Sequence, residues 1–340
     1  MVINRTFQYF SFILLVLGTT FSEIQAQSTS IADIHIRDPY ILADTKSETY
    51  YMYRSASTKK NGKQLGGVEV FKSKDLQNWE GPIHVFTVPE NNWITGRIWA
   101  PEVHSYQGKY YLFATLNSEI RWKKSQPGWT DFTFRGTQIF YSDSPEGPFL
   151  PFDNLMPHTP MDEMALDGTL WVENGIPYMI YCHEWVQTID GGMNLIQLKP
   201  DLSASVGEPL TLFHASAAPW STGSEHKQSD LPTSYVTDGC FLYRTQTEKL
   251  LMIWSSFMNG EYAIGIAESS TGKVTGPWIQ QKDPIFNKHG GHGMLFKSFD
   301  GKLNIVFHSP NSPGGSERAR IYEVEDKGDT LVLKNKLESK

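Results

Sequence analysis

Four carboxylic acids and one histidine stand at strand ends, where carboxylates are usually disfavoured. Asp38, Asp167 and Asp238 each open a short apolar run, and Glu184 closes the run that follows Asp167. His292 stands at the corresponding point of a fifth run. Because burying a carboxylate costs free energy and strands seldom begin with one, the repeated placement indicates a functional reason.

Carboxyl groups that share one cavity repel one another, and some of their pKa values are then raised. One carboxyl can stay protonated as an acid while another stays ionised as a base. Such a pair is what glycoside hydrolysis requires. Asp before Gly is also a common turn pair. The coincidence of three acids at similar points in three runs therefore carries the inference of an active site.

The runs that carry these residues share one plan, which predicts an all-β fold. No long apolar stripe with helical spacing is present, whereas short runs rich in aromatic and β-branched residues alternate with turn residues. Two-strand segments begin at Arg37, Trp99, Asp167, Thr237 and Gly291, and a second pair of strands follows each. Five units of four antiparallel strands predict a five-bladed β-propeller, whereas a β-sandwich would not predict five matched units.

A propeller would bring the acids together, because the first strand of each blade lines the central channel. With Asp38, Pro101, Asp167, Asp238 and His292 as equivalent points, these positions converge on one mouth of the channel. The second strand of each hairpin returns to that mouth. We therefore expect Glu184 to be delivered there as well.

The rest of the chain bounds the domain and its location. Residues 1–26 have a charged start, an apolar middle and small residues near Ala26, which predicts a signal peptide and a secreted or periplasmic protein. The propeller then fills residues 33–338, without a transmembrane span in the mature chain. The net charge of −7 without a basic run argues against nucleic acid as a partner. Two cysteines do not make a disulfide scaffold.

Four motifs resemble glycoside hydrolase family 43, whose members are secreted, inverting, five-bladed enzymes acting on arabinose- and xylose-containing polysaccharides. They are RDPYIL from Arg37, IWAPEV from Ile98, ALDGTLWVENGIPYMIY from Ala165 and GGHGM from Gly290. The resemblance implies that Asp38 is the general base and that Asp167 orients the acid and tunes its pKa. It also implies that His292 faces the channel centre, where it holds water or a cation such as calcium. No cofactor is required.

The fourth blade departs from the family pattern, which usually begins Glu-Gly-Pro with Glu as the general acid. Here the segment is VTDGCFLY, so Asp238 stands where Glu is expected. Its side chain is shorter by about 1.5 Å, and misplacement of this order can cost a large rate factor. Either Asp238 or Glu184 is then the acid, and the longer side chain favours Glu184. The substitution also leaves open a propeller that binds sugar without cleaving it.

Hairpin geometry places further candidate sugar-binding residues near the same mouth. The aromatic candidates are Trp99, Trp185, Trp254 and Phe257, and the basic candidates are Arg97, Arg244 and Arg318. Arg37 is expected to pair with an acid in a structural role.

The main functional expectation is an α-L-arabinofuranosidase that cleaves an oligo- or polysaccharide. A β-xylosidase or an endo-arabinanase is the alternative within the enzymes, and a non-catalytic carbohydrate-binding propeller is the alternative from another class. The sugar, the linkage and exo or endo action depend on segments between the blades, such as 117–131 and 215–232.

Overall fold

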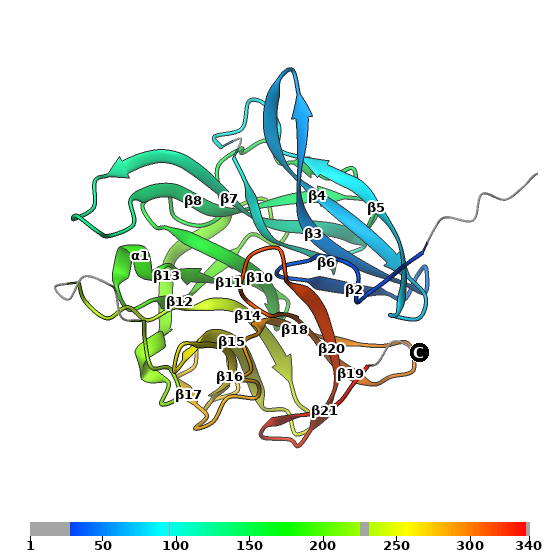
Figure 1. The fold of residues 1–340 in the computed structure, drawn as a ribbon, viewed down its shortest axis with the longest axis vertical. Helices are drawn as coiled ribbons and strands as arrows, with labels where there is room; N and C mark the ends of the chain where they lie inside the picture. The colour runs from blue at the N-terminus through cyan, green and yellow to red at the C-terminus, as the bar shows by residue number, and fades with distance from the viewer. Residues whose placement is uncertain (1–27, 95, 225–230, 338–340) are drawn as a thin grey trace, which may run out of the picture.

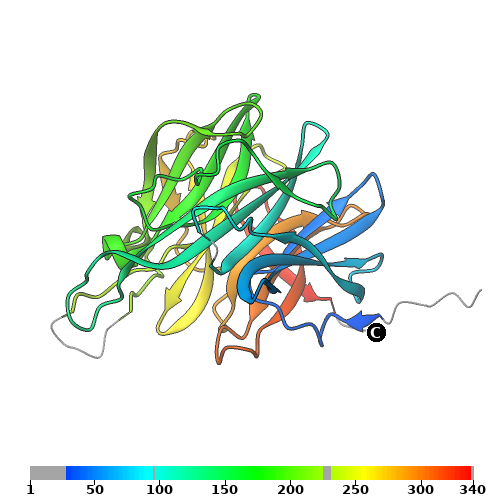
Figure 2. The same ribbon diagram turned by 90° about the horizontal axis from the view of Figure 1, so that it is seen from above.

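Five antiparallel sheets surround one central axis (Figures 1 and 2). The computed structural model describes residues 28–94, 96–224 and 231–337 of the chain. The predicted signal peptide, residues 1–26, lies outside the described residues. The order of strands in each sheet confirms the prediction of a five-bladed β-propeller.

Each blade uses four consecutive strands, with the first strand nearest the axis (Figure 1). Blade 1 contains β2 (Tyr40–Asp44), β3 (Thr49–Lys60), β4 (Lys63–Ser73) and β5 (Asn78–Thr87); blade 2 contains β6 (Ile98–Tyr106), β7 (Lys109–Lys123), β8 (Phe132–Ser142) and β9 (Leu150–Pro151). Blade 3 contains β10 (Ala165–Glu173), β11 (Ile176–His183), β12 (Gly192–Leu198) and β13 (Ser205–His214). Blade 4 contains β14 (Asp238–Arg244), β15 (Leu250–Met258), β16 (Glu261–Ser269) and β17 (Trp278–Gln280); blade 5 contains β18 (Gly291–Lys297), β19 (Leu303–Ser309), β20 (Arg318–Asp326) and β21 (Leu331–Lys336).

Three short elements complete the described part of the chain. β1 (Thr29–Ser30) pairs with β5 and gives blade 1 a fifth strand at its outer edge. The helix α1 (Trp185–Thr188) follows β11 directly, and the 3₁₀ turn η1 (Ala215–Ala217) follows β13. No helix within the described residues has the length and apolar character to cross a membrane.

Asn-Gly turns explain why several hairpins form where they do. Asn61-Gly62, Asn174-Gly175 and Asn259-Gly260 join consecutive strands, and all six residues have positive φ. Two-residue turns of this kind match the twist of the flanking strands, and asparagine and glycine adopt the required backbone most readily. The first of these turns closes the long β3–β4 hairpin, which projects from blade 1 (Figure 1).

The inner strands share one irregularity at the end that faces the mouth of the channel. One residue there has positive φ: 51° at Asp38, 40° at Ala100, 57° at Asp167, 42° at Gly239 and 53° at His292. In blades 2–5 the pairing register shifts at this point, which marks a β-bulge. In blade 1, Asp38 stands just before β2.

The bulge corrects two of the five points taken as equivalent from the sequence. Ala100, not Pro101, is the bulge residue of blade 2, and Gly239, not Asp238, is that of blade 4. Asp238 therefore lies one residue before the bulge. Glycine is required at 239, because a Cβ atom there would lie 2.5 Å from Cγ of His292.

Three of these positive-φ residues are held by a side chain from the second strand of the preceding blade. The backbone N–H of Asp167 donates to Oγ1 of Thr115 at 2.8 Å, and that of His292 donates to Oγ of Ser255 at 2.8 Å. The N–H of Asp38 lies 3.3 Å from Nδ1 of His308, the ring nitrogen that is also 3.1 Å from Oδ1 of Asp38. These bonds satisfy buried donors and fix each mouth residue to its neighbouring blade.

Blade 5 meets blade 1 without sharing a strand. The backbone N–H of Ile36 donates to the carbonyl of Glu317 at 3.2 Å, and His35 forms an isolated bridge with Arg318. The Glu317 carboxylate lies 3.2 Å from Nη1 of Arg37 and 3.1 Å from Nε2 of His35. The structural pairing expected for Arg37 is thus present. Burial would raise the pKa of Glu317, but hydrogen bonds from its own N–H, from His35, from the N–H of Gly315 and from Arg37 lower it to about 2.

We predict that Glu317→Gln lowers the free energy of unfolding at pH 7 by about 1–3 kcal/mol, because a buried charged pair loses its partner. A carboxyl with a lowered pKa stabilises the fold above its unfolded pKa, and this contribution is lost as the pH falls through the folded value. The difference between the two proteins should therefore shrink between about pH 4.5 and pH 2. Urea unfolding followed by tryptophan fluorescence at pH 7 and pH 3 measures this change.

Glu325→Gln is the matched control, because Glu325 pairs with Lys327 and Lys334 on the surface. It should leave the unfolding midpoint unchanged at both pH values. An equal loss from Glu317→Gln at pH 7 and pH 3 would contradict the assignment.

Candidate active site

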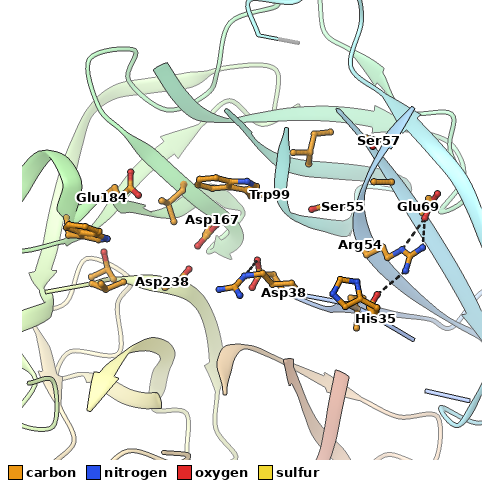
Figure 3. A pocket seen from close by; sticks show the side chains of 18 residues that line it. His35, Asp38, Arg54, Ser55, Ser57, Glu69, Trp99, Asp167, Glu184 and Asp238 are labelled. Carbon is orange, nitrogen blue, oxygen red and sulfur yellow. Dashed lines mark hydrogen bonds and ion pairs between the residues drawn. The ribbon is translucent and has the colours of Figure 1, made fainter. Parts of the chain in front are cut away.

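A cavity of about 670 Å³ opens at the mouth where the bulges converge (Figure 3). It brings together all four predicted acids and two of the predicted aromatic residues. The predicted residues that line it are Asp38, Trp99, Asp167, Glu184, Trp185 and Asp238. The geometric expectation that distant parts of the chain aim their acids into one hollow is therefore met.

His292 lies beneath three of these carboxyl groups. Its Nδ1 is 3.4 Å from Oδ1 of Asp38, 3.4 Å from Oδ1 of Asp238 and 3.8 Å from Oδ2 of Asp167. Burial alone would lower the pKa of His292, but the three carboxyl groups raise it to about 10. The imidazolium thus supplies a positive charge at the centre of the acids.

Asp38 is held in the ionised form needed of a base. Burial would raise its pKa, but His292, His308 and Arg37 together lower it. Nδ1 of His308 lies 3.1 Å from Oδ1 of Asp38, and Nε of Arg37 lies 3.8 Å from Oδ2. An ionised carboxylate in this position can accept a proton from water.

Asp167 and Asp238 form a carboxyl pair with opposite pKa shifts. Burial and the charge of Asp238 raise the pKa of Asp167 well above its usual value. Burial would raise the pKa of Asp238 too, but hydrogen bonds with Asp167, His292 and Tyr262 lower it. The Tyr262 hydroxyl donates to Oδ2 of Asp238 at 2.5 Å. Asp167 is therefore the protonated member of the pair, and Asp238 is the ionised one.

Glu184 stands on the other side of the cavity, between the end of β11 and α1. Burial raises its pKa to about 7, although the Arg135 guanidinium lowers it; Asp238 adds a smaller upward shift. Arg135 comes from β8 of blade 2 and forms a buried ion pair with Glu184. Its guanidinium carbon also lies 4.7 Å from the centre of the Trp99 ring. Glu184 is thus the carboxyl whose pKa suits proton donation near neutral pH.

The cavity is not lined by Trp254 or Phe257, which corrects the prediction that they bind sugar. Trp254 is fully buried between blades 3 and 4, where it packs 4.9 Å from Trp220 and 5.3 Å from Phe213. The ring of Phe257 packs 5.3 Å from that of Tyr262, and Phe257 is not among the residues that line the cavity.

The three predicted arginines are also absent from the residues that line the cavity. Arg244 ends β14 away from the mouth, where it bonds the carbonyls of Glu248 and Gly272. The Arg318 guanidinium donates to the carbonyls of Gly315 and Glu317. Arg97 is exposed just before β6.

Sequence reasoning missed three residues that hold the acids in place: Arg135, Tyr262 and His308. His308 ends the second strand of blade 5, in a place related to that of Glu184 in blade 3, so the hairpin argument could have found it. Arg135 and Tyr262 lie on third strands, for which that argument makes no prediction.

A cation near His292 stays a prediction. Asp167, Asp238 and His292 offer three ligand atoms within 4.8 Å of one another, a set of donors that fits a cation. A protonated imidazole cannot be a ligand, however, and with a pKa of about 10 His292 already neutralises part of the acidic charge.

An ionised carboxylate, a protonated carboxyl and a tryptophan-lined cavity at the mouth of a five-bladed propeller define a carbohydrate-active enzyme of the two-carboxylate type. The model of Glycosyl hydrolases family 43 matches residues 30–326. The chain belongs to this family, and it is a glycoside hydrolase that acts on arabinose- or xylose-containing polymers by the inverting, two-carboxylate mechanism.

Several known proteins and solved structures are similar over most of the chain. A solved structure described as an endo-arabinase from Bacteroides thetaiotaomicron VPI-5482 is 38% identical with a TM-score of 0.76, and the match covers 89% of this chain and 98% of that one. Extracellular endo-α-(1→5)-L-arabinanase 1 of Bacillus subtilis (strain 168) is 21% identical over 307 residues, which are 84% of this chain and 81% of the relative. The α-L-arabinofuranosidase from Lactobacillus brevis shares the fold at 16% identity, with a TM-score of 0.65 over 87% of this chain and 93% of that one.

We predict that Asp38→Asn reduces kcat on the polysaccharide substrate by at least about a thousandfold, because an amide cannot accept the proton from water. The far-ultraviolet circular dichroism spectrum and the binding of oligosaccharide should be retained. Asp33→Asn, an exposed acid in the same segment, is the control and should leave kcat unchanged. Turnover within tenfold of the unaltered protein would remove Asp38 from the role of base.

Proposed function

We propose that this protein is an endo-acting arabinanase that hydrolyses α-1,5-linked arabinan. The observation that carries the proposal is the extent of the cavity, which continues well past Asp38 on the side away from Glu184 (Figure 3). Glu184 and Trp185 line one side, and Arg54 and Glu69 line the other. A cleft of this extent has room for more than one sugar unit of a chain that lies across the catalytic acids.

The relatives support the endo alternative over the arabinofuranosidase expected from the sequence. The Bacteroides structure and the Bacillus subtilis protein are both described as endo-acting on arabinan. The Lactobacillus brevis arabinofuranosidase, at 16% identity, speaks for the fold alone. The Bacillus subtilis relative is also extracellular, which supports the proposal that residues 1–26 direct secretion.

Within this proposal, Asp38 takes a proton from water, which attacks the anomeric carbon, and Glu184 donates a proton to the leaving oxygen. Inverting enzymes separate these two carboxyls by about 6.5–9.5 Å. Oδ1 of Asp38 and Oδ1 of Asp238 each lie 3.4 Å from Nδ1 of His292, so they are at most twice that distance apart. Glu184 stands outside this cluster and leaves more room for the water.

The ionisation states favour the same assignment. Asp238 accepts hydrogen bonds from Tyr262 and the protonated Asp167, so it is stabilised as an anion and is a poor proton donor. Glu184, with a pKa of about 7, is substantially protonated at neutral pH. Asp167 and Asp238 then orient the reacting groups, and the ionised Asp38 and Asp238 balance the charge of His292.

We predict that the purified protein, acting on debranched arabinan, lowers the viscosity of the solution early and forms a range of oligosaccharides. An endo enzyme cuts inside chains, so little free arabinose should appear during the first tenth of the reaction. Chromatography of timed samples measures the products, with linear xylan as the control substrate. Arabinose as the sole early product, or cleavage of xylan alone, would refute the proposal.

We predict that Glu184→Gln lowers kcat/KM on arabinan by about 10²–10⁴-fold, because the leaving oxygen loses its acid. An oligoarabinoside with a dinitrophenyl leaving group needs no such acid, so its cleavage should be largely restored. Asp238→Asn should lose activity without this rescue. Rescue of Asp238→Asn alone would move the role of acid to Asp238.

The pH dependence of kcat/KM tests the role of Glu184 in a second way. The acid must be protonated, so kcat/KM should fall as the pH rises through about 7. Arg135→Met removes the positive charge that lowers the pKa of Glu184, and should move this fall to higher pH. A pH profile that does not shift in Arg135→Met would show that Arg135 does not control the pKa of the acid.

A further inference from the structure

We propose that Arg54 and Glu69 form a remote subsite for one neutral pentose unit of the substrate, apart from the bond that is cleaved. The proposal deepens the proposed endo-arabinanase function and rests on it, since only a chain substrate reaches both places. The two residues lie on neighbouring strands of blade 1, β3 and β4, directly across from each other in the pairing register.

The remote subsite belongs to the same cavity as the acids. Residues 54–57 of β3 and Glu69 of β4 line the cavity together with Asp38. Figure 3 places Arg54 and Glu69 on the far side of Asp38 from Glu184 and Asp238. A chain lying across the catalytic acids would therefore pass over this ion pair.

The Arg54 guanidinium is held rigidly before any ligand arrives. Its Nε and Nη2 both donate to Oε2 of Glu69, at 3.1 Å and 2.8 Å, and its Nη1 donates to the carbonyl of His35 at 2.9 Å. One face of the group packs on Phe71, with 4.8 Å between the guanidinium carbon and the ring centre. Binding to a group fixed in this way loses little side-chain entropy.

The pair keeps hydrogen-bonding capacity for a ligand. The three bonds use three of the five guanidinium N–H groups and one of the two Glu69 oxygens, so within the described chain two donors and the oxygen Oε1 stay available. About a quarter of each side chain is exposed, 25% for Arg54 and 24% for Glu69. Ser55, which is exposed, lines the same cavity.

This mixture of groups selects the class of ligand. Sugar hydroxyls both donate and accept hydrogen bonds, and the pair presents donors and an acceptor side by side. Its two charges balance, so it offers no excess positive charge to a uronic acid. A neutral pentose unit fits this chemistry. A pair that merely fastened the hairpin would affect stability but would not distinguish long substrates from short ones.

The test is Glu69→Ala, measured as kcat/KM on linear α-1,5-arabino-oligosaccharides of two to six units. Loss of one charge-assisted contact should lower kcat/KM on the longest substrate by about tenfold, and on the shortest by less than twofold. The measured quantity is the ratio of kcat/KM on the longest substrate to kcat/KM on the shortest, because a general loss of folding lowers both values together. Arg54→Lys, which keeps the charge but loses the fork of donors, should reduce the same ratio.

Glu90→Ala is the matched control, because Glu90 pairs with Lys60 at the exposed end of the same hairpin and does not line the cavity. It should leave the ratio unchanged. A ratio unchanged in Glu69→Ala, with the unaltered protein active, would overturn the remote subsite while leaving the proposed function intact. Inactivity of the unaltered protein on every length would overturn the proposed function and the remote subsite with it.

Discussion

The active site depends on a backbone constraint: at the channel mouth, one residue at or near the start of each inner strand adopts positive φ. For residues other than glycine this conformation costs about 1–2 kcal/mol, so the fold bears the cost four times, at Asp38, Ala100, Asp167 and His292. Ala100 has no reactive group, yet it has the same bulge. The bulge is therefore a property of the architecture, and the reactive residues of the other blades occupy a position that the propeller already provides.

The charges at the mouth follow from where these bulges point. Three acids and His292 converge, and the imidazolium is the buried cation that all three acids share. It favours the anionic forms of Asp38 and Asp238, while burial keeps Asp167 protonated. Glu184 lies beyond this cluster and pairs with Arg135 instead, so its protonation is controlled separately from theirs. Separate control is what an acid and a base working together at one pH require.

The sequence predicted the fold and the acids because both depend on period-two patterns and turn residues that repeat from blade to blade. The prediction failed where a shift of one residue along a strand decides which way a side chain faces. The Ser255 side chain accepts from the N–H of His292 in blade 5, so its neighbour Trp254 points the opposite way and packs against Phe213 of blade 3. Arg244 failed for a different reason, since it pairs with Leu250 at the opposite end of the hairpin. Arg135 reaches Glu184 from another blade, and such a long-range contact leaves no local pattern.

The seam between blades 5 and 1 has a bearing on how the enzyme would lose activity. In blades 2–5, the chain runs directly from the preceding blade to the mouth residue. Asp38 has no such covalent link to blade 5, and it follows the segment that contacts Glu317 and closes the ring. Its N–H and one carboxylate oxygen contact His308, on the far side of the seam. A small parting of the ring at this join would separate the base from its partners while every sheet kept its own ladder of hydrogen bonds. Heat or denaturant would then inactivate the enzyme while its secondary structure is still native.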